Sequence, residues 1–249
     1  MKKILVMMLT SALFIAISTR VGAADDPKAV LDKGIKALGG EENLAKVKAA
    51  TWKSKGKLFI QGNPNDFSLE ATVEGLDHAR SKFEGDFGGQ KIEGTTVIAG
   101  DKGWRTFPEA SEMDAPGVAN EKRTLYLQIL PMTLVPLKGD AYKLEAAKEE
   151  QVDGKPAVGV KVTGPDKKDF VIYFDKESGL PVKTAAKVLN FMGEEVDQET
   201  IYSAYKDFGG IKKATKSETK HNGEKLLESE TAEFKVLDKV DPKTFAKPE

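Results

Sequence analysis

Residues 52–83 read WKSKGKLFIQGNPNDFSLEATVEGLDHARSKF, and this stretch decides the fold class. Three runs within it alternate between two sets of side chains, which places one set on each face of a β-strand. The inward sets are Trp52, Ser54, Gly56, Leu58 and Ile60, then Phe67, Leu69, Ala71 and Val73, then Ala79, Ser81 and Phe83. No crossover helix separates the runs, and residues 63–66 form a turn between the first two. We therefore predict consecutive antiparallel strands, each with one solvent-facing side.

Further strands are expected on the C-terminal side of this stretch. Two runs cover residues 92–98 and 104–107, and a second series follows after residue 139. The turns of that series lie at residues 153–154, 176–179, 209–210 and 222–223, the last being an Asn-Gly hairpin signal. Its strand faces are Val158, Val160 and Val162, then Phe170, Ile172 and Phe174, then Ile201, Ser203 and Tyr205. We predict about eleven strands in two meanders.

Two short helices are predicted before the first strand. Asp26 precedes Pro27, an order typical of an N-cap followed by proline at the first helical position. The apolar stripe of this helix is Val30, Leu31, Ile35 and Leu38. The glycines at 39–40 can end the helix, and a second helix is expected over residues 41–48.

The connector between the two meanders, residues 109–139, breaks the alternation. It contains a helix-compatible run at 120–130, and nine large apolar side chains occupy the thirteen positions of 125–137. That is too much apolar surface for an exposed loop. Two interpretations stay open: a mobile lid over a ligand cavity, or a helix that permanently completes the core.

The first 23 residues are typical of an export signal. Lys2 and Lys3 precede an apolar run at 4–17, and small residues at 21–23 suit a signal peptidase. We expect residues 24–249 to form one domain of a bacterial periplasmic or secreted protein. Removing the signal makes the balance of 38 Lys+Arg against 39 Asp+Glu more acidic.

Composition excludes several classes of protein. The chain has no cysteine, so it has neither a disulfide nor a lipid-anchored cysteine of its own. No second apolar run approaches the roughly 18 to 20 residues that a membrane helix needs. A mildly acidic chain is also a poor partner for nucleic acid, whose affinity rests on Lys and Arg. We expect a soluble monomer that neither spans a membrane nor binds nucleic acid.

Four groups of residues, spread over most of the chain, form a recognisable set. They are Ala37-Leu38-Gly39-Gly40 with Leu44, Val47 and Gly56-Lys57; Tyr173-Phe174-Asp175 with Gly179-Leu180-Pro181-Val182; YSAYKDFGGIK at 202–212; and Asp241-Pro242 with Phe245-Ala246. The set resembles the LolA/LolB-like family of periplasmic proteins that sort outer-membrane lipoproteins. The resemblance implies a mainly β, α+β fold: a single strongly curved, half-open antiparallel barrel whose open side is covered by helices.

The resemblance also implies an apolar cavity that takes acyl chains, but no family ligand residue can be matched position by position. The candidate ligand-binding residues are instead the large side chains expected on the concave side and in the connector. They are Trp52, Leu58, Leu69, Phe83, Trp104, Leu125, Leu130, Met132, Leu134, Phe170, Ile172 and Phe174, with Ile92 as a further inward residue. For any single one of them core packing is the simpler explanation, so the prediction concerns the set.

Signals for catalysis, metals and cofactors are weak. The two histidines, His78 and His221, lack the spacing of a helical metal site, and no Gly-x-Ser-x-Gly elbow is present. Residues 154–159 have the glycine spacing of a phosphate-binding loop, but Val160 stands where its lysine belongs, so we predict a hairpin there. We expect no catalytic residue, metal site or cofactor.

Three lysines, Lys212, Lys216 and Lys220, recur at even spacing on one strand face. They suit either anionic head groups or a partner's acidic patch, or they protect an edge strand from pairing with another chain.

The sequence favours an exported carrier that sequesters a hydrophobic ligand, the acyl chains of a lipid or lipoprotein, without catalysis. An envelope membrane protein is a further expected partner. The alternative is a protein interaction module with a closed core and no ligand, and a hydrolase is a more distant third. An enclosed apolar pocket of several hundred Å³ would favour carriage, whereas a filled interior would favour the module.

Overall fold

The computed structural model describes residues 25–248, so the predicted export signal lies outside the described residues. Helix α1 (Pro27–Leu38) starts where the sequence predicts, since the Asp26 side chain accepts a hydrogen bond from the Lys28 amide and Pro27 opens the helix. It ends at Gly39, whose φ of 131° suits glycine. Helix α2 (Glu41–Leu44) is shorter than the predicted 41–48.

Thirteen strands form one antiparallel sheet. The strands are β1 (Ala49–Ile60), β2 (Asn63–Glu74), β3 (His78–Phe87), β4 (Gln90–Ala99), β5 (Lys102–Arg105), β6 (Ser111–Glu112), β7 (Lys143–Val152), β8 (Lys155–Thr163), β9 (Asp169–Asp175), β10 (Pro181–Leu189), β11 (Glu195–Asp207), β12 (Lys212–His221) and β13 (Glu224–Leu237). The predicted count of eleven was too low. Two strands have weak signals in the sequence: β6 has only two residues, and the β7 sequence KLEAAKEEQV lacks a clean apolar alternation.

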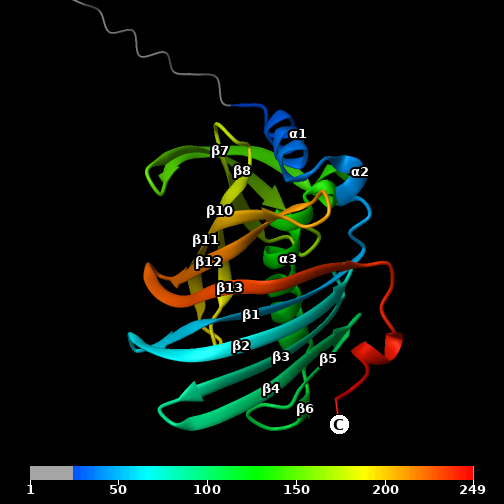
Figure 1. Ribbon diagram of the computed structural model, residues 1–249, viewed down its shortest axis with the longest axis vertical. Helices are drawn as coiled ribbons and strands as arrows, with labels where there is room; N and C mark the ends of the chain where they lie inside the picture. Colours follow the sequence, from blue (N-terminus) through cyan, green and yellow to red (C-terminus); the bar gives the residue numbers. More distant parts are fainter. Residues whose placement is uncertain (1–24, 249) are drawn as a thin grey trace, which may run out of the picture.

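The sheet consists of two meanders joined at their first and last strands. Its order is β6-β5-β4-β3-β2-β1-β13-β12-β11-β10-β9-β8-β7, and β1 pairs antiparallel with β13. The sheet is strongly curved but is not closed into a barrel, because β6 and β7 remain as its two edges (Figure 1). A curved, open, mainly β architecture was predicted, and the structure has it.

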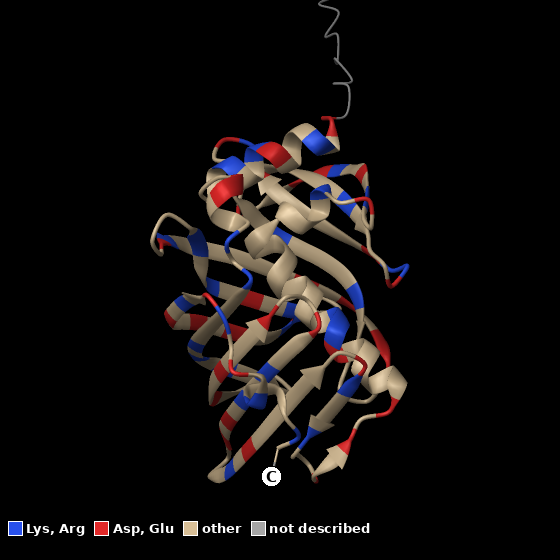
Figure 2. Ribbon diagram, turned by 90° about the vertical axis from the view of Figure 1, so that its right-hand side faces the viewer, with Lys and Arg blue, Asp and Glu red and all other residues tan. Residues whose placement is uncertain are grey.

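Helix α3 (Ala115–Thr133) connects the two edges and crosses one face of the sheet, which we call the inner face. It lies behind β13 and β1 in the view of Figure 1, and Figure 2 shows it crossing the strands. The predicted run at 120–130 was too short, because the Asp114 side chain caps the helix at the Gly117 amide and the helix continues through Pro131. The backbone leaves the helix at Leu134, where φ is 56°.

The apolar core lies between the helices and the inner face, in two main clusters. The larger one joins α1, α3 and the 3₁₀ helix η1 (Val135–Lys138) to β8 and β9, and includes Phe170, Ile172 and Phe174. The smaller one joins α3 to β1, β2 and β13 around Trp52. A second 3₁₀ helix, η2 (Pro242–Phe245), contacts β3 and β4. Among residues 25–248, no helix is both long and apolar enough to cross a bilayer.

Close packing of α1 on β9 depends on a glycine. Gly34 lies in the middle of α1, and a Cβ atom added there would come within 2.6 Å of Cε1 of Phe174. Glycine costs a helix interior about 1 kcal/mol relative to alanine, so its place here is explained by the ring beneath it. The C-terminal half of the sheet is thus covered closely.

Candidate functional site

The inner face of β1–β4 continues beyond α3 as an apolar surface. Strand register places Ser54, Leu69 and Phe83 opposite one another on successive strands, and one step further along it aligns Phe67 with Ile92 through Gly85. These positions are on the same face as Trp52, because they follow it at even spacing along the strands. The alternation seen in residues 52–83 therefore sets this surface.

Three aromatic rings, which we call the phenylalanine row, cross this surface. The ring centroids of Phe67 and Phe83 are 5.7 Å apart, and those of Phe83 and Phe87 are 6.2 Å apart, both in stacked geometry. Gly85 makes room for the row, since a Cβ atom there would lie 2.6 Å from Cε2 of Phe87. Gly94 in the same way makes room for Phe107.

The phenylalanine row is only partly covered. Trp52 is buried in the cluster under α3 with Leu125 and Ile129, whereas Phe83 and Phe87 remain half-buried. Leu58, Leu69 and Ile92, which share the face, are half-buried as well, and Phe107 is 46% exposed. An apolar surface of this kind, next to a helix and open along one side, is typical of a binding site for an apolar ligand.

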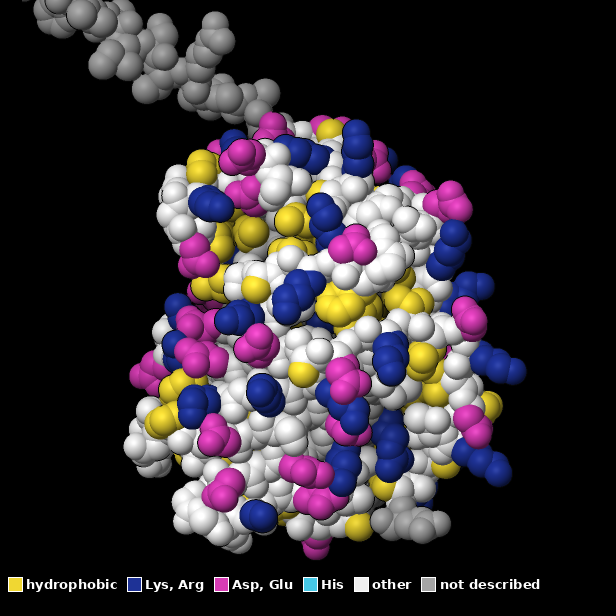
Figure 3. All heavy atoms as spheres, viewed as in Figure 1, with side chains coloured by type: hydrophobic (Ala, Val, Ile, Leu, Met, Phe, Trp, Pro, Cys, Tyr) yellow, Lys and Arg dark blue, Asp and Glu magenta, His cyan; other side chains and the backbone are white. Residues whose placement is uncertain are grey.

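The outer face of the same strands has the opposite character. Lys53 pairs with Glu70 at 2.8 Å, and Lys82 pairs with Glu93 at 2.7 Å, both across neighbouring strands. The bond to Lys53 lowers the pKa of Glu70. Figure 3 shows basic and acidic side chains interspersed over these lower strands. The two faces of one half-sheet therefore differ: ion pairs outside and aromatic rings inside.

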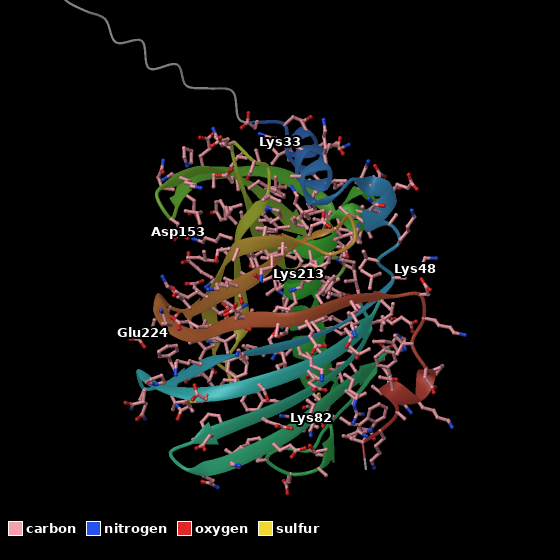
Figure 4. The ribbon with its side chains drawn as sticks, in the orientation of Figure 1. Lys33, Lys48, Lys82, Asp153, Lys213 and Glu224 are labelled. Atoms are coloured by element: carbon pink, nitrogen blue, oxygen red, sulfur yellow. The ribbon has the colours of Figure 1, made fainter. Side chains whose placement is uncertain are left out.

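A half-buried lysine adjoins the inner surface. Nζ of Lys213 on β12 lies 5.4 Å from the ring centroid of Phe234 and donates to Oγ1 of Thr231 at 3.3 Å and to the Ala214 carbonyl at 3.2 Å. Oγ1 of Thr231 is in turn 3.3 Å from Oγ of Ser54. Burial lowers the pKa of Lys213 to about 8. Figure 4 shows this residue near the centre of the molecule.

Two hollows flank the sheet. A cavity of about 60 Å³ lies between α3 and β11–β12, where Met132, Tyr202 and Lys213 are among its lining residues. A groove of about 720 Å³ is open to solvent, and charged outer-face residues such as Lys55 and Glu230 line it. The larger hollow is thus open, and its lining mixes charged side chains with apolar ones such as Phe67 and Ile201. A cavity of 60 Å³ has room for about two water molecules, far less than an acyl chain requires.

The structure divides the predicted ligand residues into groups. Leu130, Leu134, Phe170, Ile172 and Phe174 belong to the larger core cluster, and Trp52 and Leu125 belong to the smaller one, with Met132 packed against it. Leu58, Leu69, Phe83 and Ile92 lie together on the open inner surface. Sequence reasoning did not select Phe87 and Phe107 for the site, although Phe87 follows Phe83 at even spacing.

One predicted inward position lies elsewhere, and one predicted strand face is interrupted. Trp104 pairs with Val97, the neighbour of inward-facing Ile98, so it is on the outer face. On β11 it is Tyr202 that faces α3, through a bond from its hydroxyl to the Leu127 carbonyl at 3.4 Å. Ile201 therefore points outward. The predicted shared face of Ile201, Ser203 and Tyr205 is interrupted, because the residue at position 204 is left-handed (φ 53°).

The residues weighed for other roles are placed as follows. Nδ1 of His78 is 2.9 Å from Oδ1 of Asp77, and Nε2 of His221 is 3.1 Å from Oε1 of Gln198. Residues 154–159 form the β7–β8 turn and the start of β8, so the predicted hairpin is confirmed. Lys216 is on β12, which pairs with strands on both sides, so edge protection does not explain its lysines.

Comparison with solved structures identifies the class of fold. A LolA superfamily protein from Nitrosomonas europaea superposes with a TM-score of 0.56 at 10% identity, covering 89% of this chain and 97% of that one. A DUF1329 family protein from Desulfovibrio piger superposes with a TM-score of 0.55 at 12% identity, covering 89% of this chain and 98% of that one. A putative outer membrane lipoprotein-sorting protein domain from Vibrio parahaemolyticus superposes with a TM-score of 0.51 at 12% identity, covering 87% of this chain and 97% of that one.

The chain therefore has the LolA/LolB-like fold, and the resemblance seen in the sequence is confirmed. No protein-family profile and no curated protein matches it. Identities of 10 to 12% establish the fold alone, so ligand and partner have to be argued from the chain's own residues.

Proposed function

We propose that the protein is an exported, periplasmic or secreted monomer that carries a hydrophobic ligand, the acyl chains of a lipid or lipoprotein, without catalysis. The phenylalanine row carries this proposal. Phe83 and Phe87 form a half-buried aromatic surface on the concave side of a fold shared with a lipoprotein-sorting domain. Each methylene that leaves water on such a surface contributes about 0.8 kcal/mol, so one long chain gains several kcal/mol.

In this proposal α3 is a fixed wall of the site, because its middle and its end are held. At its middle, the buried Arg123 guanidinium donates to Asp166 at 3.3 Å and to the Asp169 carbonyl at 2.5 Å. Near its end, Leu130 and Leu134 are fully buried in the larger core cluster. A chain that lies along the phenylalanine row does not require α3 to move.

The test measures the lipid that co-purifies with the protein, and then the effect of substitutions on the binding of an acyl-chain fluorophore. The protein is purified from its native envelope under mild conditions and extracted lipid is measured, and an acyl-chain fluorophore is displaced by added lipid. Phe83→Asp places a charge on the inner surface and should abolish fluorophore binding. Phe59→Asp is the matched control, because Phe59 is on the outer face of β1 beneath Lys225. No co-extracted lipid together with equal binding by both variants would overturn the proposal.

A second candidate, an envelope protein interaction module, is favoured by two other observations. The cavity between α3 and the sheet is about 60 Å³, well short of the enclosed pocket of several hundred Å³ that would favour carriage. The β10–β11 turn also presents Phe191 and Met192 with 89% and 84% of their surface exposed. A photo-crosslinking residue at position 191 tests it. One defined adduct in the envelope, reproduced with the purified partner, would support the module, and crosslinking only to lipid or to nothing would count against it.

A further inference from the structure

The further inference concerns the chemical class of the ligand, and it rests on the proposed function. Its starting point is a line of inner-face residues that runs across the strands. Thr231 on β13 pairs with Ser54 on β1, Ser54 pairs with Leu69 on β2, and Leu69 pairs with Phe83 on β3. Lys213 on β12 extends the line, since its Nζ donates to Thr231. Strands are about 4.8 Å apart, so the line from β12 to β3 covers roughly 19 Å.

Polarity changes in one direction along this line. It begins with the ammonium group of Lys213, passes the two hydroxyl groups of Thr231 and Ser54, and continues with the apolar side chains of Leu69 and Phe83. An amphiphile with one charged end and one long chain matches this order in a single orientation. A ligand without a charged end would leave the ammonium group unused.

Lys213 lacks a counter-charge. Within residues 25–248, no carboxylate oxygen lies within 4.0 Å of its Nζ, and burial lowers its pKa to about 8. Lys183 provides an internal comparison, because that buried lysine has Glu150 at 2.9 Å and Glu199 at 2.5 Å, and these partners raise its pKa. A partly desolvated charge without a counter-charge is destabilising. A bound anion would give Lys213 the kind of partner that Glu150 and Glu199 give Lys183.

The two tyrosine hydroxyl groups near Lys213 have hydrogen-bond partners other than its ammonium group. The Tyr202 hydroxyl is bonded to Oγ1 of Thr184 and to the Leu127 carbonyl, and the Tyr205 hydroxyl is bonded to the Pro181 carbonyl. The cavity of about 60 Å³ lies beside Lys213 and is large enough for a small anionic group.

We propose that the inner face binds a single-chain lipid with an anionic head group, with the head group on Lys213 and the chain along Leu69 and Phe83. The head group would form charge-assisted hydrogen bonds with the ammonium group and accept from the hydroxyl groups of Thr231 and Ser54. The carboxylate of a long-chain fatty acid and the phosphate of a lysophospholipid share this chemistry.

Binding of palmitate and of hexadecanol to the purified protein tests the assignment, because the two differ only in the charged end. Lys213→Met should weaken palmitate at least tenfold, the effect expected for a buried charged hydrogen bond, and leave hexadecanol within about twofold. Phe83→Ser should weaken both ligands to a similar degree. Lys216→Met, on the outer face of the same strand, should change neither. Palmitoyl lysophosphatidate in place of palmitate shows whether carboxylate or phosphate binds more tightly.

The outcomes separate the two proposals. Binding of neither palmitate nor hexadecanol would overturn the proposed function. Equal binding of both, unaffected by Lys213→Met, would leave the carrier function in place and overturn the head-group assignment. If Lys213→Met fails to fold, the Nζ resonance of Lys213 in the unaltered protein decides the question. Palmitate should raise its pKa, and an unchanged pKa at saturation would overturn the assignment.

Discussion

The two halves of the sheet use their inner faces differently. On β9, Phe170, Ile172 and Phe174 are at most 2% exposed beneath α1 and α3, whereas on β3 the rings of Phe83 and Phe87 have no helix packed on them in either core cluster. Both halves show the same alternation in sequence. The difference arises from where the helices lie. The C-terminal meander is covered by α1 and by the side of α3 that carries Leu127 and Leu130, whereas only the opposite side of α3, with Leu125 and Ile129, covers the N-terminal meander. The C-terminal half is core, and the N-terminal half is available to a ligand.

The largest expected effect is a loss of stability in the C-terminal meander, which the helices cover. Phe174→Ala removes a fully buried ring that lies against Gly34 and should lower the free energy of unfolding by about 3 to 5 kcal/mol. Urea denaturation followed by tryptophan fluorescence measures it. Gly34→Ala, which forces a Cβ atom against the same ring, should cost about 1 to 3 kcal/mol. A loss below about 1 kcal/mol for Phe174→Ala would mean that this half is not a permanent core.

The next effect concerns Lys213 and depends on pH. The folded state lowers its pKa from 10.5 to about 8, so between these values the unfolded chain binds more protons and stability rises with pH. Lys213→Met should therefore be more stable than the unaltered protein at pH 7, by up to roughly 3 kcal/mol less the lost bonds to Thr231 and Ala214. The advantage should shrink between pH 8 and 10.5.

Paired denaturation curves at pH 7, 8.5 and 10 measure this difference, and the comparison cancels the other lysines. The tyrosines near Lys213 do not interfere, because burial raises the pKa of Tyr202 to about 12 and that of Tyr205 further. A pH-independent difference between the two proteins would show that Lys213 is not titrating in a buried site.

The sequence predicts features that depend on neighbouring residues, but not those that depend on residues far apart in the chain. Alternation placed the inward residues of β2, β8 and β9 correctly, and the Asp26–Pro27 pair located the start of α1, because these are local effects. The pairing of β1 with β13 joins residues about 180 positions apart, and no local pattern encodes it. For the same reason the sequence could not say which of two equally patterned half-sheets the helices would cover.

The missed features of the site have similar causes. Trp104 was assigned inward because it is large, yet β5 has only four residues, too few for alternation to fix a face. Lys213 was not selected because the prediction concerned the neighbouring face of Lys212, Lys216 and Lys220, which suits anionic groups or the protection of an edge strand. Its burial follows from Phe234 and α3, which meet it only in the folded chain.

In the N-terminal meander, which carries the phenylalanine row, substitution should cost less stability but more ligand affinity. Phe83→Ala removes a half-buried ring and should lower the free energy of unfolding by about 1 to 2 kcal/mol, well below the value for Phe174→Ala. Its affinity for an acyl-chain fluorophore should fall at least tenfold, since the ring lies in the middle of the phenylalanine row. If the two alanine variants lose equal stability and bind the fluorophore equally, the contrast between the half-sheets does not hold.

The smallest stability effect is expected at the β10–β11 turn, the most exposed apolar site described. Asn190 shapes this turn, because its Oδ1 accepts from the amides of Met192 and Glu194 at 2.9 and 3.0 Å. Phe191 and Met192 contribute little to folding, so the double change to serine should alter the free energy of unfolding by no more than about 0.5 kcal/mol. Retention on a hydrophobic column should fall, whereas fluorophore binding should stay unchanged because the turn is outside the phenylalanine row. Weaker fluorophore binding by the double variant would instead extend the ligand surface to the C-terminal half and remove the distinction between the two half-sheets.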